Sequence, residues 1–325
     1  MKSPAKQLRY YLEWVAINCM KLLIPLVPRA LLLPIAKNLG TAAYIFDRRG
    51  RKTGIANVRA VNKLKKLSKS NSEELILNSY QQFALSMCDL FWSSNINKTN
   101  YSKFIQVEFE NKEAIEKASR NGAIWVTPHY GNFELISLVM GFRNIKFTVV
   151  AQDFRNPRLT AIFKRAREHS GHKVISSKRA VVRLLKTLRS DEHVAFLTDL
   201  TVAPGAESVP VQCFSLITSV TRLHAFLNSK TNAPIIPGIS IPCSDGTYIM
   251  KILSPLKIPE GCDQTAIAQK CWDVFEPYIS EFPEPWIWMY RHWKYKPRET
   301  IDVNYPYYSH VSKKFDSWIK ESSEN

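Results

Sequence analysis

Two side chains of the sequence could perform acid–base chemistry together: His129 and, five residues later, Glu134. An imidazole titrates near neutral pH and can take a proton from a hydroxyl nucleophile. A neighbouring carboxylate can fix the tautomer of the ring and stabilise the imidazolium that forms, as an orienting Asp does in hydrolases. We therefore interpret His129 as a candidate general base and Glu134 as the group that holds it.

The residues around this pair indicate a loop between a strand and a helix. A buried strand is expected at 123–127 and a helix at 133–141. Between them, Gly131 allows a tight turn and Asn132 stands where a helix N-cap would be. His129 would then lie at the carboxyl end of a strand, where open α/β sheets place their sites. The alternative is a helix-capping loop whose histidine only bonds locally.

A metal site is a weaker interpretation of the same residues. His129 and Glu134 could supply two ligands, but no further cluster of His or Asp completes a site. We therefore expect no metal ion at these residues. The six cysteines are scattered without a Cys-x-x-Cys pair, which fits reduced thiols in a protein that faces the cytosol.

Short apolar runs alternate with amphipathic segments along the chain, and this alternation predicts an α/β fold. We expect a central, mostly parallel or mixed sheet flanked by helices, with a helical membrane-associated segment at the N-terminus. The strands are expected at 123–127, 147–152, 173–176, 193–199, 233–241 and 248–256. The helices are expected within 55–92 and at 133–141, 157–171, 180–190, 219–231 and 264–281.

The charge is concentrated at the N-terminus. The whole chain carries a net charge of +17, and residues 1–70 hold fifteen Lys and Arg against only Glu13 and Asp47, which accounts for +13. The same region contains the apolar run Leu22–Ala36, in which Arg29 is the only charge. Basic and apolar residues together are typical of a membrane interface. Nucleic-acid binding is not expected, because no binding motif appears.

Three prolines interrupt this apolar region, so we expect two or three short helices there. We interpret residues 1–54 as an interfacial or shallowly inserted membrane anchor and residues 55–325 as a single domain. One spanning helix, and a buried hairpin with a solvated basic rim, are the alternatives. The basic cluster at 47–52 would lie on the cytoplasmic side by the positive-inside rule.

Five stretches together resemble one family. The segment HYGNFE is similar to the His-four-residues-Asp/Glu motif of lysophospholipid and glycerolipid acyltransferases. The remaining stretches narrow the resemblance to the bacterial lipid A biosynthesis acyltransferases, the lauroyl/myristoyl family. They are the basic apolar N-terminus with 57–59, the Asn-Pro segment and helix at 151–171, the Asp-containing stretch 196–215, and the Trp-rich 283–297.

This resemblance implies that an acyl chain moves from an acyl carrier protein or acyl-CoA thioester to a hydroxyl of a lipid A precursor or related glycolipid. Such an enzyme serves lipopolysaccharide biosynthesis at the cytoplasmic side of the inner membrane, whose face is acidic. The acyl donor and the glycolipid acceptor would then be its partners, and no cofactor is implied. The rival hypotheses are a non-catalytic peripheral membrane protein and an acyltransferase for another lipid acceptor.

The resemblance also implies substrate-binding residues. Arg165 falls at the position of the family's Arg and Asp199 at that of its Asp. Arg155 and Asn156 follow an expected strand end and could meet a phosphate. Gly131 and Asn132 are the other suggested substrate-binding residues, and backbone amides near Gly131, or an Arg, could stabilise a tetrahedral oxyanion. By sequence alone, Arg165 also fits a solvated helix face, and Asp199 also fits a turn cap.

The Trp-rich segment 285–293 has two interpretations. Amphipathic aromatic residues favour the boundary between lipid and water. The same residues also suit a segment that packs into the core, and the sequence leaves both open.

Overall fold

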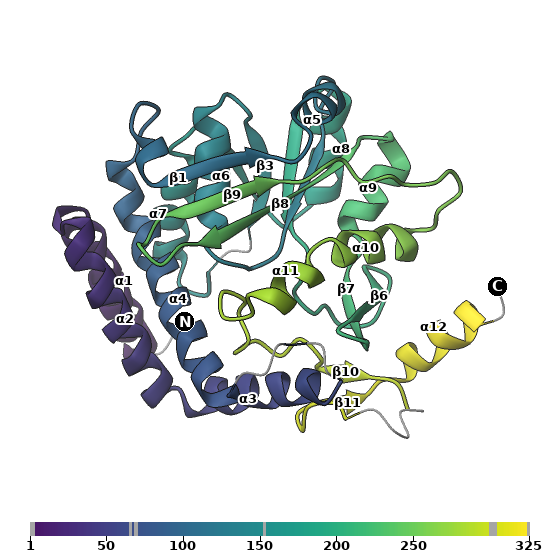
Figure 1. Ribbon diagram of the computed structural model, residues 1–325, viewed down its shortest axis with the longest axis horizontal. Coiled ribbons are helices and arrows are strands. Elements are labelled where there is room, and N and C mark those ends of the chain that lie inside the picture. The colour runs from purple at the N-terminus through teal and green to yellow at the C-terminus, as the bar shows by residue number, and fades with distance from the viewer. Residues whose placement is uncertain (1–3, 65–66, 68–70, 152–153, 299–303, 324–325) are drawn as a thin grey trace.

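The computed structural model describes residues 4–64, 67, 71–151, 154–298 and 304–323. A seven-stranded sheet forms its centre, and helices lie against both faces (Figure 1). Its strands are β1 (Ile105–Phe109), β2 (Ile124–Thr127), β3 (Phe147–Ala151), β4 (Lys173–Ser176), β5 (His193–Leu197), β8 (Ile235–Pro242) and β9 (Tyr248–Ile252). In space their order is β1-β9-β8-β2-β5-β3-β4. β8 and β9 are antiparallel and every other neighbouring pair is parallel, so the predicted α/β sheet is confirmed.

Side chains alternate between the two faces of the sheet. Along β2, Ile124 and Val126 join one buried cluster and Trp125 joins the other. The first cluster packs against α8 (Ala180–Arg189), α9 (Leu223–Thr231) and α10 (Gln264–Asp273), and the second against α5 (Lys112–Ala118) and α6 (Phe133–Phe142). After the first strand, the chain also forms α7 (Pro157–Glu168), α11 (Glu276–Glu281), α12 (Lys313–Ser323), the hairpin β6 (Ser208–Cys213) and β7 (Leu216–Thr221), and the short pair β10 (Tyr295–Lys296) and β11 (His310–Val311).

One predicted helix begins in the wrong place. The sequence suggests a helix over 219–231, but α9 starts only at Leu223, because Ser219–Thr221 belong to β7. These residues pair with β6 in register, Ser208 opposite Thr221. Long-range strand pairing therefore outweighs the local helical pattern. The elements β1, β6, α5 and α12 have no counterpart among the predicted ones.

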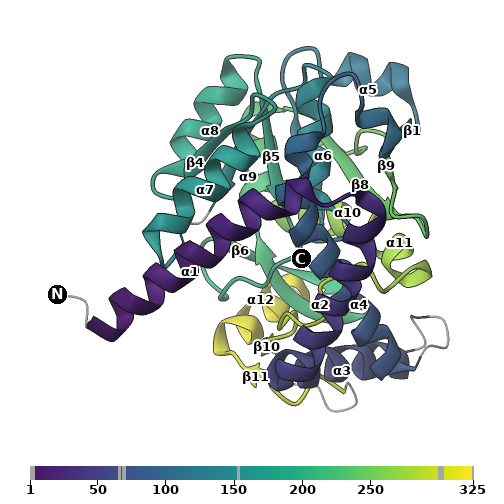
Figure 2. The same cartoon turned by 90° about the vertical axis from the view of Figure 1, so that its left-hand side faces the viewer.

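Four helices form the N-terminal part. They are α1 (Pro4–Leu23), α2 (Arg29–Phe46), α3 (Arg48–Lys63) and α4 (Ser72–Trp92). The prolines at 25 and 28 separate α1 from α2, as predicted, whereas Pro34 lies inside α2. α2 packs closely on α4, since a Cβ on Gly40 would stand 2.4 Å from the Cα of Gln81. Figure 2 shows α1 and α2 on one face of the molecule, diverging from the connection between them.

No helix in the described ranges is long and apolar enough to cross a membrane. The predicted division into residues 1–54 and 55–325 stays a prediction, and residue 54 lies within α3.

The Trp-rich segment belongs to the core. Trp286, Trp288 and Trp293 are each 0% exposed, and their rings pack against one another and against Phe214. The interpretation that they lie at a lipid boundary is therefore wrong, and the core-packing alternative is confirmed.

Candidate active site

His129 and Asp199 come together because their strands are neighbours in the sheet. β2 and β5 run parallel, with Thr127 opposite Leu197. His129 and Asp199 each follow their strand by two residues, so the same register brings them opposite each other. The Nδ1 atom of His129 lies 2.7 Å from Oδ1 of Asp199, and the backbone N–H of His129 donates to Oδ2 at 2.9 Å. The carboxylate therefore holds both the ring and the main chain of His129.

The Asp199 side chain is completely buried, whereas that of His129 is 14% exposed. The indole N–H of Trp286 donates to Oδ2 of Asp199 at 2.8 Å. Burial alone would raise the pKa of Asp199, but the attraction and hydrogen bond of His129, aided by the indole, outweigh it and lower the pKa to about 2. Because an ionised carboxylate only accepts hydrogen bonds, Nδ1 of His129 carries the proton. In the neutral form of the ring, Nε2 would therefore be the nitrogen with the lone pair, and it makes no hydrogen bond within the described residues.

The loop after β2 is fixed from several sides. Gly131 has a φ of +54°, and a Cβ there would stand 1.9 Å from the carbonyl oxygen of Ser240, so only glycine fits. Its N–H donates to the carbonyl of Pro285 at 3.0 Å, and its carbonyl accepts from Ser86 Oγ at 3.0 Å. The Gly131 amide is thus already occupied and is not a free oxyanion donor.

Asn132 is the N-cap of α6, as predicted. Its Oδ1 accepts from the backbone N–H of Leu135 at 3.2 Å. Its Nδ2 donates to Oδ2 of Asp89 at 3.0 Å. Asn132 is 0% exposed, so its side chain supports the loop from inside the protein.

The structure gives Glu134 a different partner from the one that the sequence suggests. Its carboxylate accepts from Nε of Arg167 at 3.0 and 3.1 Å and also from Nη2, whereas the ring of His129 is bonded to Asp199. The physical reason is that Glu134 lies in the first turn of α6, which packs against α7, the helix that carries Arg167. Glu134 and His129 nevertheless line the same cleft.

The other suggested substrate-binding residues lie elsewhere. Arg165 and Arg155 are exposed and line no part of the cleft that holds His129, so Arg165 takes the solvated-face alternative. Asn156 is buried, caps α7 and donates to the carbonyl of Tyr10 at 2.9 Å, which ties α7 to α1. The carboxylate of Asp199 is fully enclosed and faces His129.

A cleft of about 450 Å³ opens beside His129. This volume falls in the range of roughly 300–1,000 Å³ that is typical of small-molecule sites. One part of the wall is polar and contains His129, Glu134, Arg167, Thr127 and Ser137. The other part is apolar and comes from the carboxyl ends of the strands and from flanking segments: Val149, Val150, Ala151, Phe154, Val174, Phe196, Leu197, Leu200 and Leu223. The cleft therefore combines a reactive polar end with a slot for an apolar group.

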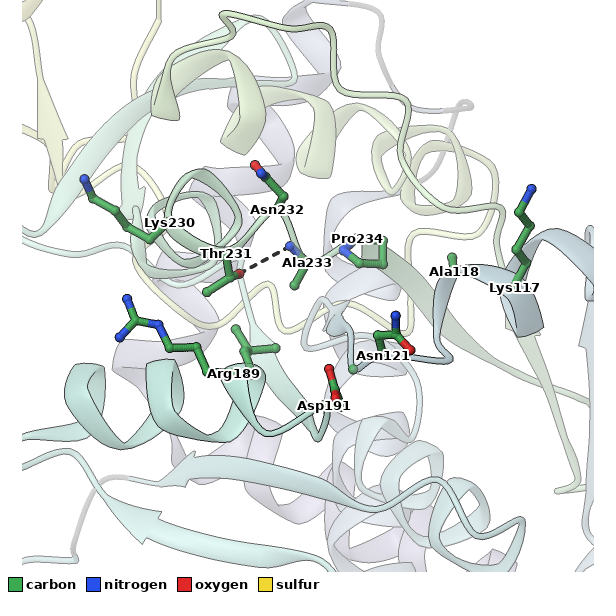
Figure 3. A pocket seen from close by; sticks show the side chains of 12 residues that line it. Lys117, Ala118, Asn121, Arg189, Asp191, Lys230, Thr231, Asn232, Ala233 and Pro234 are labelled. Carbon is green, nitrogen blue, oxygen red and sulfur yellow. Dashed lines mark hydrogen bonds between the residues drawn. The ribbon is translucent and has the colours of Figure 1, made fainter.

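A second hollow, of about 540 Å³, lies at the opposite ends of the strands (Figure 3). Gly122, Asp191 and Pro234, which precede β2, β5 and β8, contribute to its lining. Lys117 lies across the hollow from Lys230 and Arg189 (Figure 3). Because His129 lies beyond the carboxyl end of β2, this hollow is separate from the candidate active site. The described residues include no group of His, Cys, Asp and Glu able to hold a metal ion.

A family model described as bacterial lipid A biosynthesis acyltransferase matches residues 2–295. The chain belongs to this family. The resemblance drawn from the motifs is thereby confirmed, and it places the chain among the acyltransferases.

Two curated relatives carry related names. A lipid A biosynthesis acyltransferase of Haemophilus influenzae is 25% identical over 212 residues, which are 64% of this chain and 65% of that protein. A lipid A biosynthesis lauroyltransferase of Escherichia coli is 21% identical over 295 residues, 89% of this chain and 93% of that protein.

For this member of the lipid A acyltransferase family, sequence reasoning missed two residues of the site. Arg167 stands two positions after the suggested Arg165, and only its place on the half-buried side of α7 could have distinguished it. Trp286 lies in the Trp-rich segment, for which core packing was one of the two interpretations of the sequence. Its bond to Asp199 could not be inferred from the sequence, because 87 residues separate them.

Proposed function

We propose that this protein transfers a fatty acyl chain from a thioester to a hydroxyl of a lipid A precursor, with Nε2 of His129 as the general base. The observation that carries the proposal is the His129–Asp199 pair at the polar end of a half-apolar cleft. Asp199, rather than Glu134, orients the ring in this proposal, because its buried carboxylate fixes the tautomer that leaves Nε2 basic.

The proposed reaction is a direct acyl transfer. Nε2 of His129 takes the proton of the acceptor hydroxyl while the oxygen attacks the thioester carbonyl carbon. The tetrahedral intermediate collapses, the C–S bond breaks, and the imidazolium returns the proton to the departing thiolate. An ester and a free thiol are the products, so atoms and charge balance without any cofactor.

Arg167 is suited to stabilise the oxyanion of that intermediate. Its guanidinium lines the cleft, and Glu134 engages it through Nε and Nη2, which leaves Nη1 without a partner among the described residues. A guanidinium held by a carboxylate is a preorganised donor, and such donors stabilise developing charge most effectively in a site that excludes water. In this proposal Glu134 acts by positioning Arg167.

We also propose that the enzyme works on the cytoplasmic face of the inner membrane, with the outer sides of α1 and α2 in contact with lipid. Ten large apolar side chains of α1, α2 and their connection are at least 44% exposed: Leu8, Leu12, Leu22, Leu23, Leu26, Leu31, Ile35, Leu39, Ile45 and Phe46. So many exposed large apolar side chains in one part of the chain are unusual on a soluble surface. Exposed basic residues on the same helices, Lys6, Lys21 and Lys37 among them, suit anionic lipid.

Vesicle binding tests this surface. We expect Leu26→Asp with Leu31→Asp to reduce co-sedimentation with phosphatidylglycerol-containing vesicles by about tenfold or more, since charged groups are costly in hydrocarbon. The same two changes at Val181 and Val182, exposed residues of α8, serve as the control and are expected to leave binding unchanged. Equal binding by both double variants would remove the membrane role from α1 and α2.

His129→Ala tests the reaction itself. Purified protein, a lipid A precursor in vesicles and lauroyl thioesters of either acyl carrier protein or coenzyme A are combined, and ester formation is followed by mass spectrometry. We expect loss of transfer by at least about 10³-fold, because the other described bases of the cleft are engaged: Glu134 holds Arg167, and both ring nitrogens of His172 are hydrogen-bonded. His169→Ala, at an exposed histidine after α7, is the matched control. Full activity of a folded His129→Ala protein would refute the assignment and favour a non-catalytic membrane protein.

A further inference from the structure

The one charge in the apolar run Leu22–Ala36 points into the protein. Arg29 begins α2, and its side chain is only 17% exposed. On the other side of the same helix, Leu31 is 57% and Ile35 is 44% exposed. The outward side of α2 is thus apolar and the inward side carries a guanidinium, which is the reverse of an ordinary surface helix. Such an arrangement requires a specific partner inside.

That partner is Asp89 on α4. Both terminal nitrogens of Arg29 reach the carboxylate: Nη1 bonds Oδ1, and Nη2 lies 3.2 Å from Oδ2. Nη2 also donates to the carbonyl of Gly246 at 2.6 Å, and the guanidinium stacks over the ring of Trp92 at 5.1 Å. Planar, bidentate contacts of this kind fix direction as well as distance.

Asp89 connects this ion pair to the loop that carries His129. Its side chain is 2% exposed, and its Oδ2 accepts from Tyr248 Oη at 2.7 Å and from Asn132 Nδ2 at 3.0 Å. Asn132 caps α6 and follows His129 by three residues. One carboxylate therefore joins α2, α4 and the loop of the active site.

We propose that Arg29 and Asp89 are positioning residues for the acyl transfer. Their ion pair holds the loop of His129 in place through Asn132, so the geometry of that loop depends on the position of α2 against α4. The inference rests on the proposed function. If α2 lies on lipid, as its exposed apolar side suggests, the ion pair connects contact with the membrane surface to the alignment of His129. A displacement of about 1 Å at a reacting group can cost about 10²-fold in rate, so a modest shift of α2 would suffice.

Asn132→Ser severs this connection at its loop end. Serine caps helices as well as asparagine does, so α6 should keep its N-cap, but its short side chain cannot reach Asp89. We expect kcat to fall by about 10- to 100-fold, with KM for the thioester changed less than about threefold. Asn111→Ser, which makes the same change at the exposed cap of α5, is the matched control and should keep wild-type kcat.

The double variant Arg29→Met with Asp89→Asn tests the other end. It removes both charges together, which avoids an unpaired buried ion, and it keeps an oxygen at position 89 for Asn132. We expect kcat to fall in detergent micelles, but by less than in Asn132→Ser because position 89 still accepts from Asn132, and any stimulation by phosphatidylglycerol vesicles to be lost while the protein still co-sediments with them.

The outcomes separate this inference from the proposed function. Wild-type kcat and vesicle stimulation in folded Asn132→Ser and double variants, together with an inactive His129→Ala, would overturn only the coupling. Activity losses that match the loss of folded protein in thermal melts would also overturn it, since the pair would then serve stability alone. An active His129→Ala would overturn the proposed function instead.

Discussion

Two buried aspartates contact different residues of the same loop, Asp199 at His129 and Asp89 at Asn132, and they differ in role. The side chain of Asp199 is completely buried and faces a titratable group, the ring of His129, which reaches the cleft. Asp89 is 2% exposed and faces Arg29, whose charge is permanent, in a position enclosed by α2, α4 and β9. The difference teaches that burial alone does not identify a reactive carboxylate. Whether such a carboxylate takes part in a reaction depends on the nature of its partner and on whether that partner reaches a cavity.

The pKa values of the two carboxyl groups also differ. Burial raises the pKa of Asp89, and the charge of Arg29 together with the hydrogen bonds from Arg29, Tyr248 and Asn132 only limits the rise. Burial acts in the same direction on Asp199, but His129 and Trp286 overcome it, so its pKa falls to about 2. A buried carboxylate that stays firmly ionised is the one suited to orient an imidazole.

The largest expected effect comes from Asp199→Asn. An amide can donate to Nδ1 and select the wrong tautomer, so we expect kcat/KM to fall by about 10³-fold or more. The equivalent change Asp89→Asn should cost no more than about 10²-fold. Steady-state kinetics of the two proteins, with thermal melts as the control for folding, make the measurement. Equal losses would erase the functional distinction between the two aspartates.

An intermediate effect is expected at Arg167, which the carboxylate of Glu134 holds. Glu134 resembles Asp89 in binding an arginine, and it resembles the Asp199–His129 pair in being part of the cleft. Arg167→Met should lower kcat by about 10²-fold, because an oxyanion donor is lost. Arg165→Ala, two residues earlier on an exposed position, is the matched control and should change kcat less than about twofold. The reverse ranking would return Arg165 to the site.

The smallest effect concerns stability against pH. The lowered pKa of Asp199 means that its ionised form stabilises the native state by about 2 kcal/mol above the pKa of the unfolded chain, and that this is lost as the pH falls from about 4 to about 2. For Asp89 the raised pKa gives the opposite sign, so its contribution improves towards acid. Urea unfolding of the wild type, Asp199→Asn and Asp89→Asn proteins between pH 5 and pH 2.5 compares them. Parallel pH profiles for the two variants would contradict these signs.

The local features of the site followed from the sequence. The strand before His129, the turn at Gly131 and the cap at Asn132 are encoded within a few residues, because periodicity, left-handed φ and capping are short-range properties. The choice between neighbouring groups was harder. Glu134 is the carboxylate nearest to His129 in sequence, yet it turns to Arg167, because the direction of a side chain in the first turn of a helix depends on what packs there.

The sequence by itself thus determined an α/β chain with a basic, apolar N-terminus and a histidine at the carboxyl end of a strand. Only the tertiary structure decided that β5 lies beside β2, and this strand order selects Asp199 as the partner of His129 across seventy positions of sequence. It also decided that Arg29 turns inward to Asp89 and that three tryptophans fill the core. The physical reason is that propensity and capping act locally, whereas the pairing of strands and of buried charges depends on segments far apart in the chain.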